Sequence, residues 1–195
     1  MVNVNPGIEQ LMFHQLHQLI FEILLKSDGR TTDLLETLAG EKTTVQVIRQ
    51  EQIESSDIEF AANMSEGPCY LRESILVCER TRFVVSHNFA LVFARHVPPD
   101  MFEALAARQE GIGKAIVSLG LQTSRKLSDY GWRAGEEVVD PFYRPFRLRF
   151  PNPSPNAGTP YKRYAIHFGE EPGIHLLEYF NPDIVRHRLL RDGGW

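Results

Sequence analysis

The sequence predicts an α+β fold, a six-stranded antiparallel sheet with helices packed on one side. Three observations lead to this prediction. Apolar residues recur at helical spacing near the start and the middle of the chain. Other stretches show the alternating or continuous apolar pattern of strands, and they cover residues 43–54, 69–79, 82–93, 142–150, 161–168 and 174–180. Consecutive strands are largely joined by turn-forming segments, which favours hairpins and therefore antiparallel pairing.

The helices are predicted from apolar spacing and from the residues at their ends. They are expected over residues 8–26, 34–38, 98–108 and 114–119. The sequence SDG ends the first of these helices. Asp33 and Glu36 are placed for a capping box at the second, and Gly40 is placed to stop it.

The strand pair CYLRESILVCE and RFVVSHNFALVF is predicted to form a hairpin around a tight turn at Arg80 and Thr81. The segment FYRPFRLRF, residues 142–150, alternates arginine with apolar residues and is also predicted to be a strand. The loop over 151–160 is rich in turn formers. The chain is expected to end in a short helix that frays, with residues 186–195 as its tail.

Length and composition predict one domain over residues 1–195 with a sizeable core. The net charge of −4 gives no general attraction for nucleic acid, so an anionic ligand needs a local cluster of arginine or lysine. The sequence contains no run of about 18 apolar residues, so we expect no membrane span. The N-terminus lacks the basic start of a secretory signal. We therefore expect a cytoplasmic chain.

Motifs for metals, phosphate and covalent nucleophiles are not found. The sequence GIGK at residues 111–114 lacks the Ser or Thr that a phosphate-binding loop requires next. His14 and His17 lie three apart on a helix without a third ligand. Cys69 and Cys78 would lie roughly 30 Å apart on one strand, too far for a disulfide. We expect buried free thiols, no metal and no cofactor.

Glu178 interrupts an apolar row in the strand GIHLLEYFNPDIV. Alternation places it on one face with Ile174, Leu176 and Phe180. A dry environment raises the pKa of a carboxyl, which suits a group that donates a proton near neutral pH. The alternatives are a buried ion pair with an arginine, or a strand register that exposes Glu178 to water.

Basic residues offer partners for an anionic ligand. Arg72 shares a half-apolar face with Tyr70, Ser74 and Leu76, although it could equally be an arginine at the rim of the sheet. Arg125 belongs to a basic stretch that could also be an ordinary solvated face.

The stretches TTVQVIRQ, YLRESILVC, GIGKAI, SRKLSDYGW, FRLRF and LLEYFNPDIV resemble the chorismate lyase family, in its order and near its spacing. The resemblance is closest to the branch found in cyanobacteria and mycobacteria, and it runs from about Leu19 to Val185. It implies a six-stranded antiparallel sheet with helices on one side. It also implies the cofactor-free conversion of chorismate to 4-hydroxybenzoate and pyruvate, a precursor step for quinones or phenolic lipids.

The resemblance implies a role for individual residues. Arg72 would grip the ring carboxylate as a bidentate pair, and Glu178 would meet the oxygen at the 4-position of the ring. The implied substrate-binding residues are Val47 and Ile112 through their backbone, Arg125 and Arg147 at the pyruvyl carboxylate, and His87. His87 stands where the enterobacterial enzymes carry an arginine, and a histidine is the weaker anchor for an anion.

Two other functions stay open. The effector domains of some GntR-type regulators share this fold and bind small molecules without chemistry, so a binding module for an aromatic acid is the main alternative. Too few residues precede the resemblance for a winged helix-turn-helix, and the negative charge also disfavours DNA binding. A related enzyme could form another hydroxybenzoate isomer. The expected partners are chorismate and 4-hydroxybenzoate.

Overall fold

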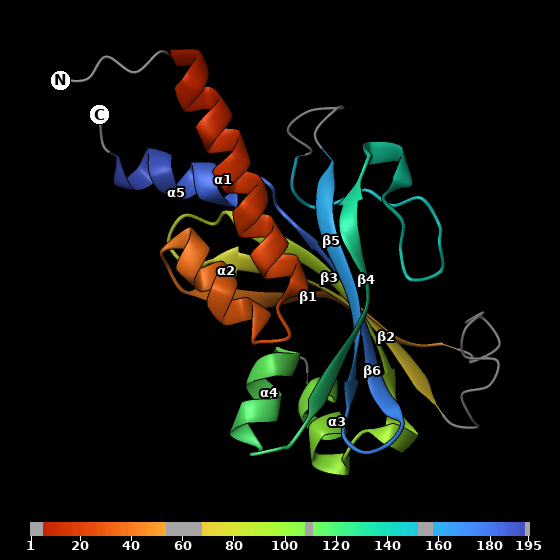
Figure 1. Ribbon diagram of the computed structural model, residues 1–195. Helices are drawn as coiled ribbons and strands as arrows, with labels where there is room; N and C mark the ends of the chain where they lie inside the picture. The colour runs from red at the N-terminus through yellow and green to blue at the C-terminus, as the bar shows by residue number, and fades with distance from the viewer. Residues whose placement is uncertain (1–5, 54–67, 108–110, 152–157, 194–195) are drawn as a thin grey trace.

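A single antiparallel sheet forms the centre of the computed structural model, which describes residues 6–53, 68–107, 111–151 and 158–193 (Figure 1). The strand order is β1-β2-β3-β6-β5-β4. The strands are β1 Thr43–Ile53, β2 Cys69–Cys78, β3 Val84–Phe93, β4 Ser124–Arg133, β5 Thr159–His167 and β6 Pro172–Phe180. The predicted fold class, an α+β fold with a six-stranded antiparallel sheet, is confirmed.

Helices α1 to α4 cover one face of the sheet, while the segment that follows β4 lies on the other (Figure 1). The α-helices are α1 Pro6–Lys26, α2 Thr31–Ala39, α3 Pro99–Ala106, α4 Ile112–Ser118 and α5 Ile184–Asp192. Two short 3-10 turns, η3 Ala94–His96 and η4 Gly135–Glu137, complete the described elements. The end of the helix expected over 98–108 and most of the loop expected over 151–160 fall outside the described residues.

One predicted strand is wrong, and one observed strand was not predicted. Residues 142–150 form turns and irregular chain with a single bridge between Val139 and Pro145. Proline lacks a backbone N–H, and Tyr143 has a φ of 60°, so this segment cannot continue a ladder. The observed strand that was not predicted is β4, which is polar and largely exposed along its length. An edge strand needs little apolar sequence, and its pattern is correspondingly weak.

The expected capping box at α2 is also wrong. The helix begins at Thr31 after Arg30, which makes no side-chain cap. Glu36 instead accepts a hydrogen bond from the backbone N–H of Thr43 at 3.0 Å and so joins α2 to β1. Gly40 ends the helix with a φ of 68°, as predicted for a left-handed cap.

The C-terminal segment is held against α2 rather than frayed over residues 186–192. The guanidinium of Arg191 donates to the carbonyl of Ala39 at 2.9 Å and pairs with Glu41 at 3.0 Å. Arg188 donates to the carbonyl of Thr37. These carbonyls belong to the end of α2, where helical partners run out. The expected fray is therefore corrected for the described part of this tail.

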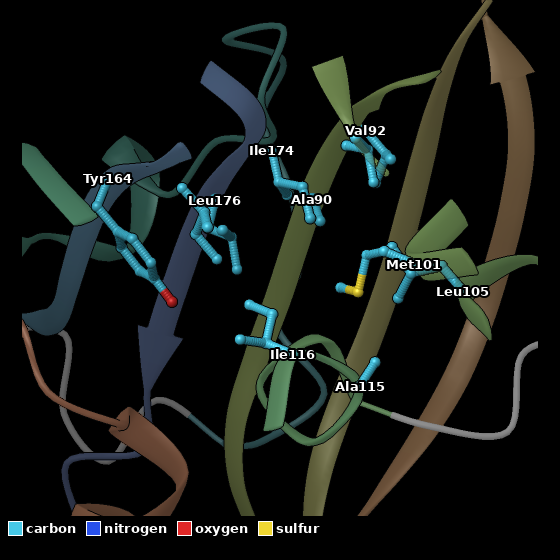
Figure 2. Close-up of a cluster of buried hydrophobic side chains, with 11 residues drawn as sticks. Ala90, Val92, Met101, Leu105, Ala115, Ile116, Tyr164, Ile174 and Leu176 are labelled. Atoms are coloured by element: carbon cyan, nitrogen blue, oxygen red, sulfur yellow. The ribbon is translucent and has the colours of Figure 1, made fainter. Parts of the chain in front are cut away.

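The helix-covered face of the sheet carries two separate hydrophobic clusters. In the first, Met101 and Leu105 of α3 and Ile116 of α4 pack on Ala90 and Leu176. Figure 2 shows these side chains meeting between the two helices and strands β3 and β6. The second cluster joins α1, α2 and α5 to the far ends of β2, β3 and β6. The opposite face has its own cluster, onto which the segment 138–150 packs.

Candidate functional site

Polar side chains form a row across the sheet, between the two clusters on the helix-covered face. The strand register places Ser74 opposite Asn88, Asn88 opposite Glu178, and Glu178 opposite Lys162. The neighbouring row on the same face contains Arg72, Ala90, Leu176 and Tyr164. Arg72 and Glu178 therefore point to the same side, two strands apart and two residues offset, which is about 12 Å between α-carbons.

A cavity of about 480 Å³ lies over this polar row. This volume is in the range typical of small-molecule sites. Arg72 and Glu178 both line the cavity, together with Ser74 and Asn88. The apolar side chains of Leu76, Ile112, Val117, Ile166 and Leu176 form other parts of its wall. The arrangement suits a ligand that has an apolar body and charged groups at its ends.

The guanidinium of Arg72 is buried and held in place, with the residue only 2% exposed. It donates to the carbonyl of Leu105 at 2.8 Å and to the side-chain oxygen of Gln50 at 3.1 Å. The Leu105 carbonyl lies in the last turn of α3. The end of α3 therefore orients a positive charge at one end of the cavity.

Glu178 lines the same cavity and is buried, with the residue 6% exposed. Its Oε2 atom accepts no hydrogen bond from the described part of the chain, and the nearest recorded cation is the ammonium of Lys162 at 4.0 Å. Burial raises the pKa of the Glu178 carboxyl above its usual value, while Lys162, Tyr164, Arg125 and Thr31 act in the opposite direction. The predicted dry carboxyl is therefore present, and its protonated form persists to higher pH than in a free glutamate.

Lys162 lies beside Glu178 without lining the cavity, and it was missed in the sequence. It is 2% exposed, and its ammonium lies 3.5 Å from the carbonyl of Ser27. Burial lowers the pKa of Lys162, and the nearby Glu178 opposes that shift. Alternation in YKRYAIHF places Lys162 on one face with Tyr164 and Ile166, and this pattern could have indicated a buried lysine beside an apolar row.

Arg125 and Ile112 also line the cavity, whereas Val47 does not. Arg125 reaches it from β4 and donates to the carbonyl of Asp28 at 3.2 Å. Ile112 begins α4, and Gly111 before it packs against β1. A Cβ at Gly111 would lie 2.8 Å from Cγ2 of Val45, so glycine allows this approach. The β1 contribution to the wall thus comes from Val45 and its neighbours.

Two predicted substrate contacts, His87 and Arg147, are wrong. His87 is fully buried on the opposite face, where its Nε2 bonds Glu73 at 3.0 Å and its Nδ1 accepts from the backbone N–H of Arg149 at 3.2 Å. Burial lowers the pKa of His87 to about 4, so a neutral ring faces Glu73. Arg147 is exposed in the segment 138–150 that covers that same face. Neither side chain reaches the cavity.

A smaller cavity of about 300 Å³ lies on the other side of β5 and β6. It is lined by Arg133 and Arg163 and by the carboxylate of Asp129. The ring of Tyr143 covers the guanidinium of Arg163 at 4.7 Å. Because this cavity lacks a buried carboxyl, the cavity of Arg72 and Glu178 is the better candidate for acid–base chemistry.

The cysteines and the metal-binding residue types add nothing to the site. Cys69 and Cys78 are buried free thiols on β2, and burial raises their pKa values to about 12 and about 11. Neither is a thiolate near neutral pH. The described residues contain no group of three His, Cys, Asp or Glu side chains that could hold a metal ion. Among these residues, no helix has the length and apolar character needed to cross a membrane.

Comparisons with known proteins give similarity at the level of fold only. No protein-family model matches the chain, and no curated protein matches it. PhnF from Mycobacterium smegmatis is similar with a TM-score of 0.49 and 10% identity, over 81% of this chain and 66% of that one. The possible transcriptional regulator YydK from Bacillus subtilis has a TM-score of 0.43 and 13% identity, over 71% of this chain and 58% of that one.

The ligand-binding domain of a putative GntR-family transcriptional regulator from Bordetella bronchiseptica is also similar. Its TM-score is 0.44 at 12% identity, over 72% of this chain and 86% of that domain. The chain spans less than two thirds of the length of PhnF and YydK. Similarity of this kind carries no argument about activity, and none of the comparisons supports the expected lyase reaction.

Proposed function

We propose that this chain binds a small aromatic carboxylic acid in the cavity between Arg72 and Glu178, and that it converts chorismate to 4-hydroxybenzoate and pyruvate. One observation carries the proposal: a buried carboxyl with a raised pKa lines the same cavity as a buried guanidinium. A guanidinium recognises a carboxylate through parallel N–H donors. A carboxyl of raised pKa can donate a proton to a leaving oxygen.

The reaction needs few protein groups because the product is aromatic. The bond between the ring and the enolpyruvyl oxygen breaks, and that oxygen takes the proton of Glu178. The proposed contact of Glu178 is therefore with this ether oxygen, on the carbon next to the 4-position, and not with the 4-position oxygen. The ring carbon that bears the hydroxyl loses its hydrogen as a proton, and the electron pair completes the aromatic ring. The enol then becomes pyruvate. One proton is delivered and one is released, so Glu178 is restored when it accepts the released proton.

The apolar wall of the cavity supports this chemistry. Leu76 and Leu176 lie on either side of the polar row and supply apolar surface to the cavity wall. Exclusion of water strengthens the ion pair of Arg72 with the ring carboxylate and limits side reactions. Since His87 and Arg147 lie on the other face, Arg125 remains the proposed partner for the pyruvyl carboxylate. The proposed unit is residues 1–195, acting in the cytoplasm.

Incubation of the purified protein with chorismate tests the proposal. We expect 4-hydroxybenzoate and pyruvate in equal amounts without added metal, identified by chromatography, mass and ultraviolet spectrum. Formation of another hydroxybenzoate isomer would keep the site but correct the pose of the ring. The absence of any product, with the protein folded, would refute the lyase proposal.

The second candidate function is a binding module without chemistry. The ammonium of Lys162 lies 4.0 Å from Glu178, and it favours the charged carboxylate, which cannot donate a proton. Solved structures of similar fold include a regulator's ligand-binding domain. For this candidate we expect 4-hydroxybenzoate to bind in calorimetry and chorismate to remain unchanged. The same pair of measurements therefore separates the two functions.

A further inference from the structure

Helix α1 carries two apolar faces, and only one of them packs against the rest of the described chain. Phe21, Leu24 and Leu25 are buried in the cluster beneath the helix. Met12, Leu16, Leu19 and Ile23 are 61%, 54%, 53% and 59% exposed. At about 100° per residue, the centres of the two sets are about 160° apart around the helix. We call the exposed set the outer stripe of α1.

The outer stripe is larger than isolated surface residues would explain. Ile8, 52% exposed, extends it toward the N-terminus, while Leu11, 56% exposed, points about 110° away from its centre. Exposed apolar patches of this kind on a folded protein commonly mark an interaction site. Figure 1 shows α1 reaching past the sheet at its N-terminal half, so a partner could approach the stripe from outside.

We propose that the outer stripe binds the same stripe of a second copy, with the two α1 helices antiparallel. Its members are spaced by four, three and four residues, which is the spacing of a coiled-coil seam. A twofold axis between residues 17 and 18 places Met12 against the partner's Ile23 and Leu16 against the partner's Leu19. Such a self-complementary contact closes as a dimer.

The charges of α1 fit this register. In the same arrangement Glu9 lies against the partner's Lys26, which also pairs with Glu22 of its own helix. An ion pair then closes the seam at each end. Glu9, Glu22 and Lys26 are the charged side chains of the helix, and the other polar positions near the stripe are glutamine or histidine. The stripe therefore has little like-charge repulsion. It also lacks the basic flank that an anionic membrane surface would favour.

The helix is already formed before association. Its buried face holds the C-terminal half on the sheet, and His17 bonds the carbonyl of Pro182 at 2.7 Å. A helix that is already formed lowers the entropy cost of pairing. The association we propose needs no rearrangement of the candidate site and is independent of the proposed function.

Sedimentation and light scattering of the full chain test the dimer. We expect a concentration-dependent mass of twice the 22.3 kDa chain. Leu16→Glu and Leu19→Glu should each raise the dissociation constant at least about 100-fold, because each places a charge twice in the seam. Val117→Glu on α4, with a residue of the same 54% exposure, is the matched control and should leave the dimer unchanged. Circular dichroism checks the fold of each variant.

A charge exchange tests the direction of pairing. Glu9→Lys and Lys26→Glu should each weaken the antiparallel dimer, and the double variant should restore it. In a parallel pair the double variant would gain nothing over the singles. A wild-type monomer at every concentration, or a dimer insensitive to both leucine variants, would overturn the proposal. A monomer that binds neutral phospholipid vesicles through Leu16 would also overturn it and assign the stripe to a membrane.

Discussion

Two buried glutamates, on opposite faces of the same sheet, show different environments. Glu73 on β2 is 4% exposed and Glu178 on β6 is 6% exposed. The carboxylate of Glu73 accepts a hydrogen bond from Nε of Arg49 at 2.7 Å and is bonded to Nε2 of His87 at 3.0 Å. Glu73 lines neither of the two cavities described above. Glu178 has an oxygen without a hydrogen bond in the described chain, and it lines a cavity.

This difference shows that burial alone does not identify a functional carboxyl. A buried charge needs partners, and Glu73 finds them within the chain. Glu178 has a cation at 4.0 Å and the polar side chains of Tyr164 and Thr31 nearby, but its Oε2 accepts no hydrogen bond from the described part of the chain. An unsatisfied buried oxygen is costly, so its presence beside a cavity makes Glu178 the better functional candidate of the two.

The largest expected effect compares these two residues directly. Glu178→Gln removes the proposed proton donor and keeps the size of the side chain, so turnover of chorismate should fall about 10²–10⁴-fold. Binding of 4-hydroxybenzoate should persist, because Arg72 is unchanged. Steady-state kinetics and calorimetry measure the two effects separately.

Glu73→Gln is the matched control for this comparison. It weakens the contacts with Arg49 and His87, so the free energy of unfolding should fall by about 1–3 kcal/mol. Turnover per folded molecule should stay at the wild-type level. If Glu73→Gln abolished turnover while Glu178→Gln did not, the assignment of the two faces would be reversed.

A smaller effect concerns the pH dependence of turnover. The protonated form of Glu178 is the donor, so turnover should be constant at low pH and decline as pH rises through its raised pKa. Lys162 lowers that pKa, and Lys162→Met removes the charge while it keeps a similar chain length. The declining limb should therefore move to higher pH. If the pH at which turnover declines stayed the same or became lower in this variant, Glu178 would not be the titrating donor.

The smallest effect concerns the rim of the cavity. Arg125 is only partly buried on β4, and contacts between exposed charges are worth about 1 kcal/mol or less. Arg125→Ala should raise KM for chorismate by about fivefold and leave kcat nearly unchanged. Lys126→Ala, the next residue on the same strand, is the control because its side chain does not line the cavity. A large loss of kcat in Arg125→Ala would place this residue in the chemistry.

Much of the fold was predictable because strand alternation is a local property. The faces expected for Arg72 and Glu178 agree with the structure, since each strand is long and largely apolar. Alternation also puts His87 on one face with Phe89 and Leu91, as the structure shows. The resemblance, not alternation, assigned His87 to the site. Alternation could not correct that assignment, because it does not tell which face of one strand joins which face of another.

The errors at β4 and at residues 142–150 have one physical cause: the side-chain pattern does not report whether the backbone pairs with a neighbouring strand. A polar edge strand is stabilised by backbone pairing with β5, which leaves little trace in its side chains. The arginine and phenylalanine alternation of 142–150 reflects packing on the sheet without a ladder, as Phe142 and Phe146 contact the cluster of the opposite face. Lys162 was missed because its burial depends on α1 and the Ser27 carbonyl, far away in the chain.

The sequence by itself determined the fold class, most of the strands, and the faces on which the chemically active residues point, because these follow from local periodicity. Only the tertiary structure decided that Arg72 and Glu178 share a cavity, that His87 and Arg147 do not, and that Lys162 stands beside the carboxyl. Those facts depend on strand order and on the helices that cover one face. Both arise from packing between residues distant in sequence, which no short pattern encodes.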